Sequence, residues 1–389
     1  MSRGIVITGV GVISKLGDSI TQMMDQISDG KTAFSKYRED DESGSDGRFL
    51  EFEAETYLGR KGIRPLNRCT RMLLAAAGLA LNDGAFEIES YNEEEIGVVA
   101  ATNFGVDTSI REMEKTIVTD GADYLSPISA FNSSINAVAS QVSIRRKAKA
   151  FNITDASGFS AGINSLILAK NLILAGKANA VLVGGCEELS DDLVKEYKQA
   201  ELLATKSAGM KPFDQYSEGL LLGDGAVVIL LEDLDYAKAR KAKIYCRVEE
   251  SFITFYPNNI SSSLVTEFLR SNLVASEGGI HDIDLIMSSA NGSVADVKER
   301  EAIDAIFKPD VKLFNIKTYM GEGFAFSNML QIALGAYALK NRYIPVCSAL
   351  DADVPPEPGD LNKVLIHSLG LDGTHGAVIF GKYKEELSC

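Results

Sequence analysis

The chain has 389 residues, of which 46% are hydrophobic, and its 39 basic and 54 acidic side chains give a formal net charge of −15. This composition predicts a folded protein of two to three domain-sized units, and the negative charge argues against nucleic acid or an anionic membrane as a partner. No apolar run reaches the length of a membrane span and residues 1–8 lack the apolar core of a signal peptide, so we expect a cytoplasmic protein.

Short apolar, β-branched runs alternate with helical patterns along the whole chain. The expected strands are 5–13, 96–101, 151–154, 180–184, 226–231, 285–287, 363–368 and 377–380. The expected helices are 70–81, 133–143, 161–174, 297–306 and 327–339. This alternation predicts α/β layers around buried, partly parallel sheets. Two apolar strands that follow glycine each resemble the closing strand of a half, which predicts an internal duplication into residues 1–240 and 241–389.

Gly9-Val10-Gly11 in the first strand permits two interpretations, a dinucleotide-binding loop or a tight turn that closes a buried strand. The third glycine position of the dinucleotide fingerprint falls on Ser14, and no acidic residue follows at the expected distance. We therefore favour the turn and expect no cofactor.

Residues 153–162, Ile-Thr-Asp-Ala-Ser-Gly-Phe-Ser-Ala-Gly, close one strand and open a long apolar helix. The amino end of a helix lowers the pKa of a thiol and stabilises a developing oxyanion, so such an elbow suits a nucleophile. Phe159 stands at its tip and offers no lone pair, proton or charge. Ser157 and Ser160 flank it, so a displaced serine nucleophile in an acyltransferase or hydrolase is the rival interpretation. No histidine is placed by a motif to deprotonate either serine.

The three histidines, His281, His367 and His375, have neither metal-ligand spacing nor the order of a known triad, so we expect structural roles for them and no metal. The cysteines are odd in number and scattered, which favours reduced thiols. They are Cys69, Cys186, Cys246, Cys347 and Cys389.

One basic cluster is either a solvated helix face or a contact surface for an acidic protein or a phosphate. It consists of Arg60, Lys61, Arg64, Arg68 and Arg71.

Several ordered motifs resemble those of the β-ketoacyl-acyl-carrier-protein synthases of the thiolase-like superfamily. These are 212–214 (Pro-Phe-Asp) with 222–226 (Leu-Gly-Asp-Gly-Ala), 183–187 (Val-Gly-Gly-Cys-Glu) and 317–321 (Lys-Thr-Tyr-Met-Gly). The resemblance covers most of the chain. It implies an α/β fold of five layers, α-β-α-β-α, built from two duplicated halves, and dimers that pair through the N-terminal half.

Active members of this family use one cysteine and two histidines, and the resemblance places all three on residues of other types here. The cysteine position falls on Phe159, and the two histidine positions fall on Asn291 and Glu322, whereas Lys317 is retained. Asn291 keeps a hydrogen-bond donor, but an ionised Glu322 would repel an enolate. The resemblance therefore implies that this chain does not carry out the condensation.

A condensing-enzyme homologue without its triad resembles the chain length factor of type II polyketide synthases. Such a subunit pairs with an active ketosynthase and shapes the tunnel into which the chain grows. The candidate tunnel and gate residues are Phe104, Ser129 and Leu371. The acyl carrier protein is expected to dock mainly on the partner. The candidate docking residues on this chain are Arg60, Lys61, Arg64 and Arg68.

Overall fold

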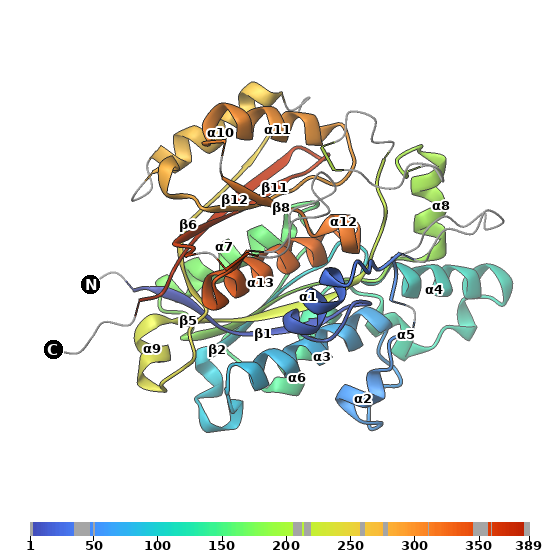
Figure 1. The fold of residues 1–389 in the computed structure, drawn as a ribbon. Coiled ribbons are helices and arrows are strands. Elements are labelled where there is room, and N and C mark those ends of the chain that lie inside the picture. The colour runs from blue at the N-terminus through green and yellow to red at the C-terminus, as the bar shows by residue number, and fades with distance from the viewer. Residues whose placement is uncertain are drawn as a thin grey trace.

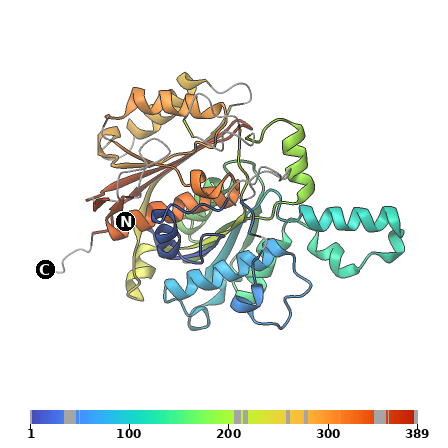
Figure 2. The same ribbon diagram turned by 45° about the vertical axis from the view of Figure 1, so that its right-hand side comes forward.

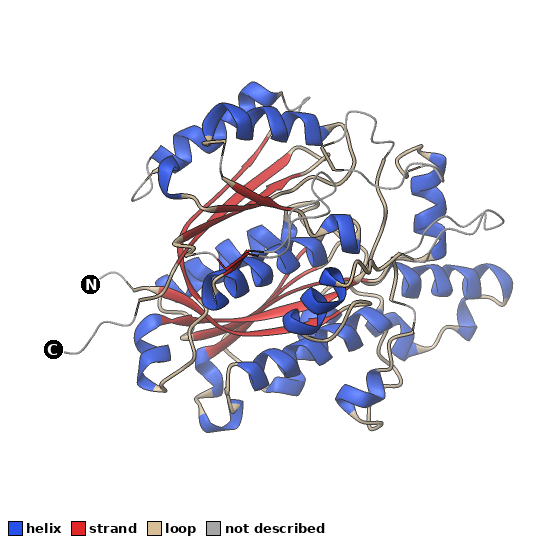
Figure 3. Ribbon diagram, viewed as in Figure 1, coloured by secondary structure: helices blue, strands red, loops and turns tan. Residues whose placement is uncertain are grey.

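The structure is a computed structural model of the chain and describes residues 3–34, 47–49, 51–204, 212–213, 219–256, 261–274, 279–309, 311–344, 357–358 and 360–384. Ten strands form one mixed sheet in the order β3-β2-β4-β5-β1-β6-β12-β11-β7-β8. Figures 1 and 3 show that the sheet divides into two layers with helices between them. The layers are joined where β1 pairs with β6 at Val6–Arg247 and Ile7–Cys246.

The first layer holds the five strands of the N-terminal half. They are β1 (Ile5–Ile13), β2 (Ile96–Ala101), β3 (Asn152–Asp155), β4 (Ala180–Glu187) and β5 (Gly225–Asp233). Strand β2 runs parallel to β3 and β4, whereas β5 runs antiparallel to β4 and β1.

The second layer repeats this order and these directions with the strands of the C-terminal half. They are β6 (Cys246–Phe255), β7 (Leu285–Met287), β8 (Lys312–Phe314), β11 (Lys363–Leu369) and β12 (Thr374–Gly381). Strand β7 runs parallel to β8 and β11, and β12 runs antiparallel to β11 and β6. The predicted duplication is therefore present in the topology. The boundary near residue 240 remains our proposal, and it lies beside α9 (Leu234–Ala239), between β5 and β6.

Helices complete a five-layer arrangement, as predicted. Helices α7 (Ala161–Leu174) and α13 (Ala325–Asn341) lie between the two sheets (Figure 1). Helix α13 is apolar on nearly every side, which is the pattern of a helix without a solvent face. The outer layers are α3 (Arg68–Asp83) with α6 (Ala137–Arg146), and α10 (Ser262–Val274) with α11 (Ala295–Ile306). The main apolar clusters follow these layers, one around α7 and α13 and one beneath each outer pair.

The remaining elements lie mainly at one end of the layers or on their periphery. They are α1 (Ile20–Ser28), α2 (Ala54–Leu58), α4 (Asp107–Thr119), α5 (Pro127–Asn132), α8 (Asp191–Gln199), α12 (Lys317–Met320), β9 (Tyr343–Ile344) and β10 (Glu357–Pro358). Figure 2 shows α4 reaching out from the body of the molecule. Within the described residues, no helix combines the length and the apolar character that crossing a bilayer requires.

Two predictions about local structure were wrong. Gly9 and Gly11 are not in a turn but inside β1, where an added Cβ would clash with the backbone oxygens of Ala80 and Ala76 in α3. The helix expected at 133–143 begins only after Asn136, because α5 ends at Asn132 and the Ser133 hydroxyl donates to the Ala130 carbonyl.

Candidate functional site

The elbow forms as the sequence predicts, between the end of β3 and the start of α7. Gly158 has φ +90°, a left-handed value that glycine adopts without strain. The Asn103 side chain holds this residue from both sides, because Nδ2 donates to the Gly158 carbonyl (3.1 Å) and Oδ1 accepts from the Gly158 N–H (2.9 Å). The backbone around Phe159 is therefore held in place by a side chain that follows β2.

The Phe159 ring packs into an aromatic cluster centred on Phe324. The centroid of the Phe324 ring lies 5.1 Å from that of Phe159, 5.0 Å from that of Phe104 and 6.0 Å from that of Tyr197. All three pairs are edge-on, which is a favourable geometry for aromatic rings. Buried leucines complete the cluster: Leu189, Leu193 and Leu222. The structure thus brings Phe159 and Phe104, predicted separately as the lost nucleophile and a gate, onto the same ring.

The two residues predicted at the family's histidine positions, Asn291 and Glu322, form a buried polar cluster with Lys317. Lys317 Nζ lies 2.7 Å from Glu322 Oε2, and Asn291 Nδ2 donates to the same oxygen at 2.9 Å. The second carboxylate oxygen of Glu322 accepts the Phe324 N–H at 2.8 Å. The donor that we expected Asn291 to retain is therefore used by Glu322. The Lys317 and Glu322 side chains are only 3% and 1% exposed, so their charges neutralise one another within the fold.

Glu187, at the end of β4, forms hydrogen bonds with the residues that follow β2, of which Asn103 contacts the elbow. Its carboxylate accepts the backbone N–H groups of Asn103 and Phe104, each at 2.8 Å, and also the Thr102 hydroxyl. Burial raises the pKa of Glu187 to about 8, although these hydrogen bonds act in the opposite direction. Glu187 therefore positions Asn103, which in turn holds Gly158.

The serines of the rival interpretation have no base among their described partners. The Ser160 hydroxyl is buried and shares a hydrogen bond with the Ser368 hydroxyl at 2.9 Å. Ser157 is exposed. His367 and His375 bond to one another at 2.8 Å, and the other ring nitrogen of His367 contacts Glu299. The His281 side chain lies outside the described part of the chain.

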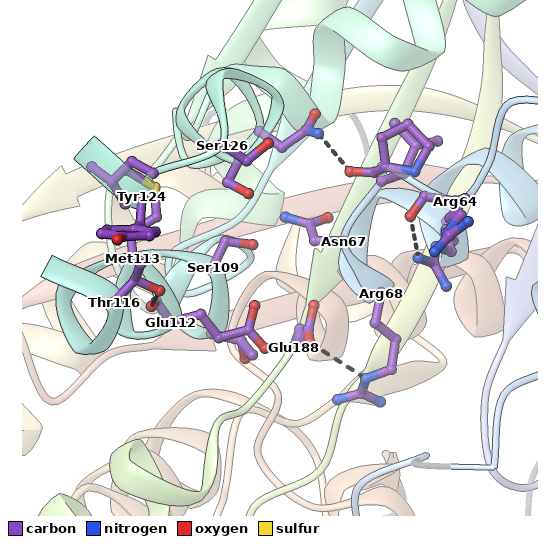
Figure 4. A pocket seen from close by; sticks show the side chains of 17 residues that line it. Arg64, Asn67, Arg68, Ser109, Glu112, Met113, Thr116, Tyr124, Ser126 and Glu188 are labelled. Carbon is purple, nitrogen blue, oxygen red and sulfur yellow. Dashed lines mark hydrogen bonds and ion pairs between the residues drawn. The ribbon is translucent and has the colours of Figure 1, made fainter. Parts of the chain in front are cut away.

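A pocket of about 470 Å³ lies between the start of α3 and the helices α4 and α5 (Figure 4). It collects one predicted tunnel residue, Ser129, and two predicted docking residues, Arg64 and Arg68. Five serine and threonine residues of its wall carry hydroxyl groups, and only Ser129 among these residues was predicted from the sequence. They are Thr108, Ser109, Thr116, Ser126 and Ser129.

The predicted docking residues differ in their surroundings. Arg60, Lys61 and Arg64 are exposed. The Arg68 guanidinium instead lies 2.5 Å from the buried Asp224 carboxylate and donates to the Phe49 carbonyl, and Figure 4 shows it directed toward Glu188. Because these partners hold Arg68 within the fold, the docking prediction now depends on the other three residues.

Leu371 lies 38% exposed in the turn between β11 and β12. Its neighbour Asp372 contacts the elbow directly, since it accepts the Phe159 N–H at 2.9 Å. Asp372, Phe324 and Tyr197 were not predicted from the sequence. The motif around Lys317 and Glu322 pointed to the neighbourhood of Phe324, and the predicted gate Leu371 is adjacent to Asp372, whereas no local signal marked Tyr197.

The model of the β-ketoacyl synthase N-terminal domain matches residues 2–237, and the chain belongs to the β-ketoacyl synthase family. It is 24% identical to 3-oxoacyl-[acyl-carrier-protein] synthase 2 of Vibrio harveyi over 98% of this chain and 99% of that one. The corresponding Rhizobium meliloti protein is 25% identical, with the same coverage.

Solved structures share the fold along almost the whole chain. The ishigamide ketosynthase/chain length factor superposes with a TM-score of 0.87 at 20% identity and covers 99% of this chain and 100% of that one. A β-ketoacyl synthase from Burkholderia phymatum gives a TM-score of 0.86 at 20% identity with the same coverage. The predicted thiolase-like fold is therefore confirmed.

Proposed function

We propose that this chain is a non-catalytic subunit of the chain length factor type, which pairs with an active β-ketoacyl-acyl-carrier-protein synthase. The observation that carries the proposal is the packing of the Phe159 ring against Phe324 at the tip of the elbow. A thioester carbonyl must approach the tip closely to be attacked, and here an aromatic ring occupies that place. A hydrocarbon ring has no electron pair to form an acyl bond.

The cluster of Asn291, Lys317 and Glu322 supports the same conclusion. A decarboxylating extender unit develops negative charge that has to be stabilised by preorganised donors or cations. The Lys317 ammonium is the cation of this cluster, and it is neutralised by Glu322 at 2.7 Å. Asn291 donates its side-chain N–H to Glu322, so this donor is not directed at a ligand. The cluster is therefore satisfied internally.

The proposed partner surface is the arm formed by residues 107–132, which comprises α4, α5 and the segment between them. No residue of α4 is buried, although the helix is amphipathic. Tyr124, Ile128 and Phe131 are 74%, 58% and 59% exposed on the following segment and α5. Apolar side chains gathered in this way on a projecting element are typical of a surface that another protein covers. A chain of the same fold, with an intact cysteine and two histidines, is the partner that the proposal requires.

The pocket beside this arm is the proposed site of tunnel shaping. Its wall combines hydroxyl-bearing and charged side chains, and the Thr116 hydroxyl already donates to the Glu112 carbonyl. The remaining hydroxyls and the position next to the partner surface suit a growing chain that carries carbonyl oxygens, because hydroxyls donate to such oxygens. Phe104 and Leu371 would act nearer the elbow. Arg60, Lys61 and Arg64 remain the proposed docking residues for an acyl carrier protein.

Co-expression with a candidate active ketosynthase tests the pairing. We expect recovery of the two chains in a one-to-one complex, and we expect Phe131→Asp to abolish it because a carboxylate would be buried in the interface. The matched control is Phe255→Asp, since Phe255 is also 59% exposed but lies on β6. Recovery of this chain alone as a stable homodimer would contradict the proposal.

Intact-mass analysis after incubation with acylated carrier protein tests the lack of catalysis. We expect no mass increase on this chain. Acylation of Ser157 or Ser160 would instead establish the serine acyltransferase or hydrolase.

A further inference from the structure

Asp372 is held by its own turn so that one carboxylate oxygen faces the N–H of Phe159, two residues before the start of α7. Its Oδ1 accepts the N–H and the hydroxyl of Thr374, at 3.0 and 2.6 Å. Its Oδ2 accepts the Phe159 N–H at 2.9 Å. The turn between β11 and β12 thus orients the carboxylate before it meets the elbow, which joins the two halves of the fold at this point.

Glycines on both sides leave room for this carboxylate. A Cβ added at Gly158 would clash with Asp372 Oδ2, and one added at Gly370 would clash with Asp372 Oδ1. The Cβ at Gly370 would also lie 2.7 Å from the Phe159 Cβ. A ligand atom that accepted the Phe159 N–H would therefore have to displace the Asp372 side chain.

We propose that Asp372, an exposed residue, supplies an anion from this chain that fills the position which an acyl oxygen would take at this elbow, so that charge closes the site independently of the Phe159 ring. The Phe159 N–H, which lies two residues before the start of α7 at Ala161, can stabilise one anion through a hydrogen bond. A carboxylate already uses that stabilisation here, and it repels a second anion in the same place. A nucleophile restored at residue 159 would consequently meet an unfavourable field. This inference goes beyond the proposed function.

The test introduces a thiol as a probe and compares Phe159→Cys, Phe159→Cys/Asp372→Asn and Phe159→Cys/Asp304→Asn. Asp304 is the matched control because its side chain is 57% exposed on α11, where it pairs with Arg300. The pKa of the introduced thiol follows from the pH dependence of its alkylation by iodoacetamide, measured on the peptide that contains residue 159. The other ionisable groups around the elbow, Glu187, Tyr197 and the Lys317–Glu322 pair, are common to all three variants.

We expect the Asp372→Asn change to lower the pKa of the thiol by about one unit, a tenfold change in the thiolate equilibrium, and the Asp304→Asn change to leave it unaltered. Equal pKa values in all three variants would overturn the proposal.

A second measurement needs no change at residue 159. Hydrogen exchange of the Phe159 amide should accelerate at least tenfold in Asp372→Ala but not in Asp304→Ala, and an unchanged rate in Asp372→Ala would overturn the proposal. Neither measurement uses a partner or carrier protein, so a negative result leaves the proposed pairing unaffected.

Discussion

Replacing Lys317 by Met should destabilise the fold strongly, because it leaves a buried carboxylate without its counter-charge. The Lys317 and Glu322 side chains are 3% and 1% exposed, and their charged atoms lie 2.7 Å apart. After the substitution, Glu322 would keep the hydrogen bonds from Asn291 and the Phe324 N–H but no cation. Removing one partner of such a buried pair costs about 3–5 kcal/mol.

Differential scanning calorimetry measures this loss of stability as a decrease in Tm. With 389 residues and about 2.1 cal/mol/K of unfolding entropy per residue, the cost corresponds to a Tm lower by about 4–6 °C. The double variant Lys317→Met/Glu322→Gln should recover most of this loss, since it removes both charges. Lys195→Met is the surface control, because Lys195 and its partner Asp192 are 68% and 54% exposed. Equal Tm values for Lys317→Met and Lys195→Met would refute the reasoning.

Three further predictions address the rest of the site. Burial raises the pKa of Glu187 from 4.5 to about 8, so between these values the folded chain holds a proton that the unfolded chain has lost. The stability of the wild type relative to Glu187→Gln should therefore fall with rising pH across that interval, by up to about 1.4 kcal/mol per unit, and a pH-independent difference in unfolding free energy would contradict this. Phe104→Ala should lengthen the products made with an active partner, because it removes a ring that packs on Phe324; an unchanged product profile would count against such a gate. Arg64→Glu should lower turnover with an acidic carrier protein while Arg300→Glu on α11 does not, and equal rates would dismiss docking at Arg64.

The layered fold was predictable because its central elements have the clearest patterns. Helices α7 and α13 were predicted to within two residues, since both are long, predominantly apolar segments without internal proline. Strand β6 was missed because exposed and buried residues alternate irregularly along it. Strand β8 was missed because its three residues, Lys312–Phe314, begin with a lysine.

The candidate site was only partly predictable. The family resemblance assigned Phe159, Asn291 and Glu322 to the site, because these residues lie within or between ordered motifs. Contacts between segments that are distant along the chain were not indicated by any pattern in the sequence. Asp372 reaches Phe159 across 213 residues of sequence, and Tyr197 reaches Phe324 from a separate peripheral helix. Arg68 looked like a surface cation, because the sequence does not reveal that Asp224 is buried beside it.

The position of strand β3 at the edge of the sheet links the binding of another chain to the geometry of the elbow. Strand β3 is the outermost strand of its layer, is four residues long and leads directly into the elbow. Its outer edge therefore offers unpaired backbone groups to any neighbour that can align a strand with it. A protein that bound at this edge could shift the backbone that leads into the elbow and so change the position of residue 159. Partner binding and the geometry of the elbow would then be under joint selection. A substitution at β3 that improved one would also affect the other.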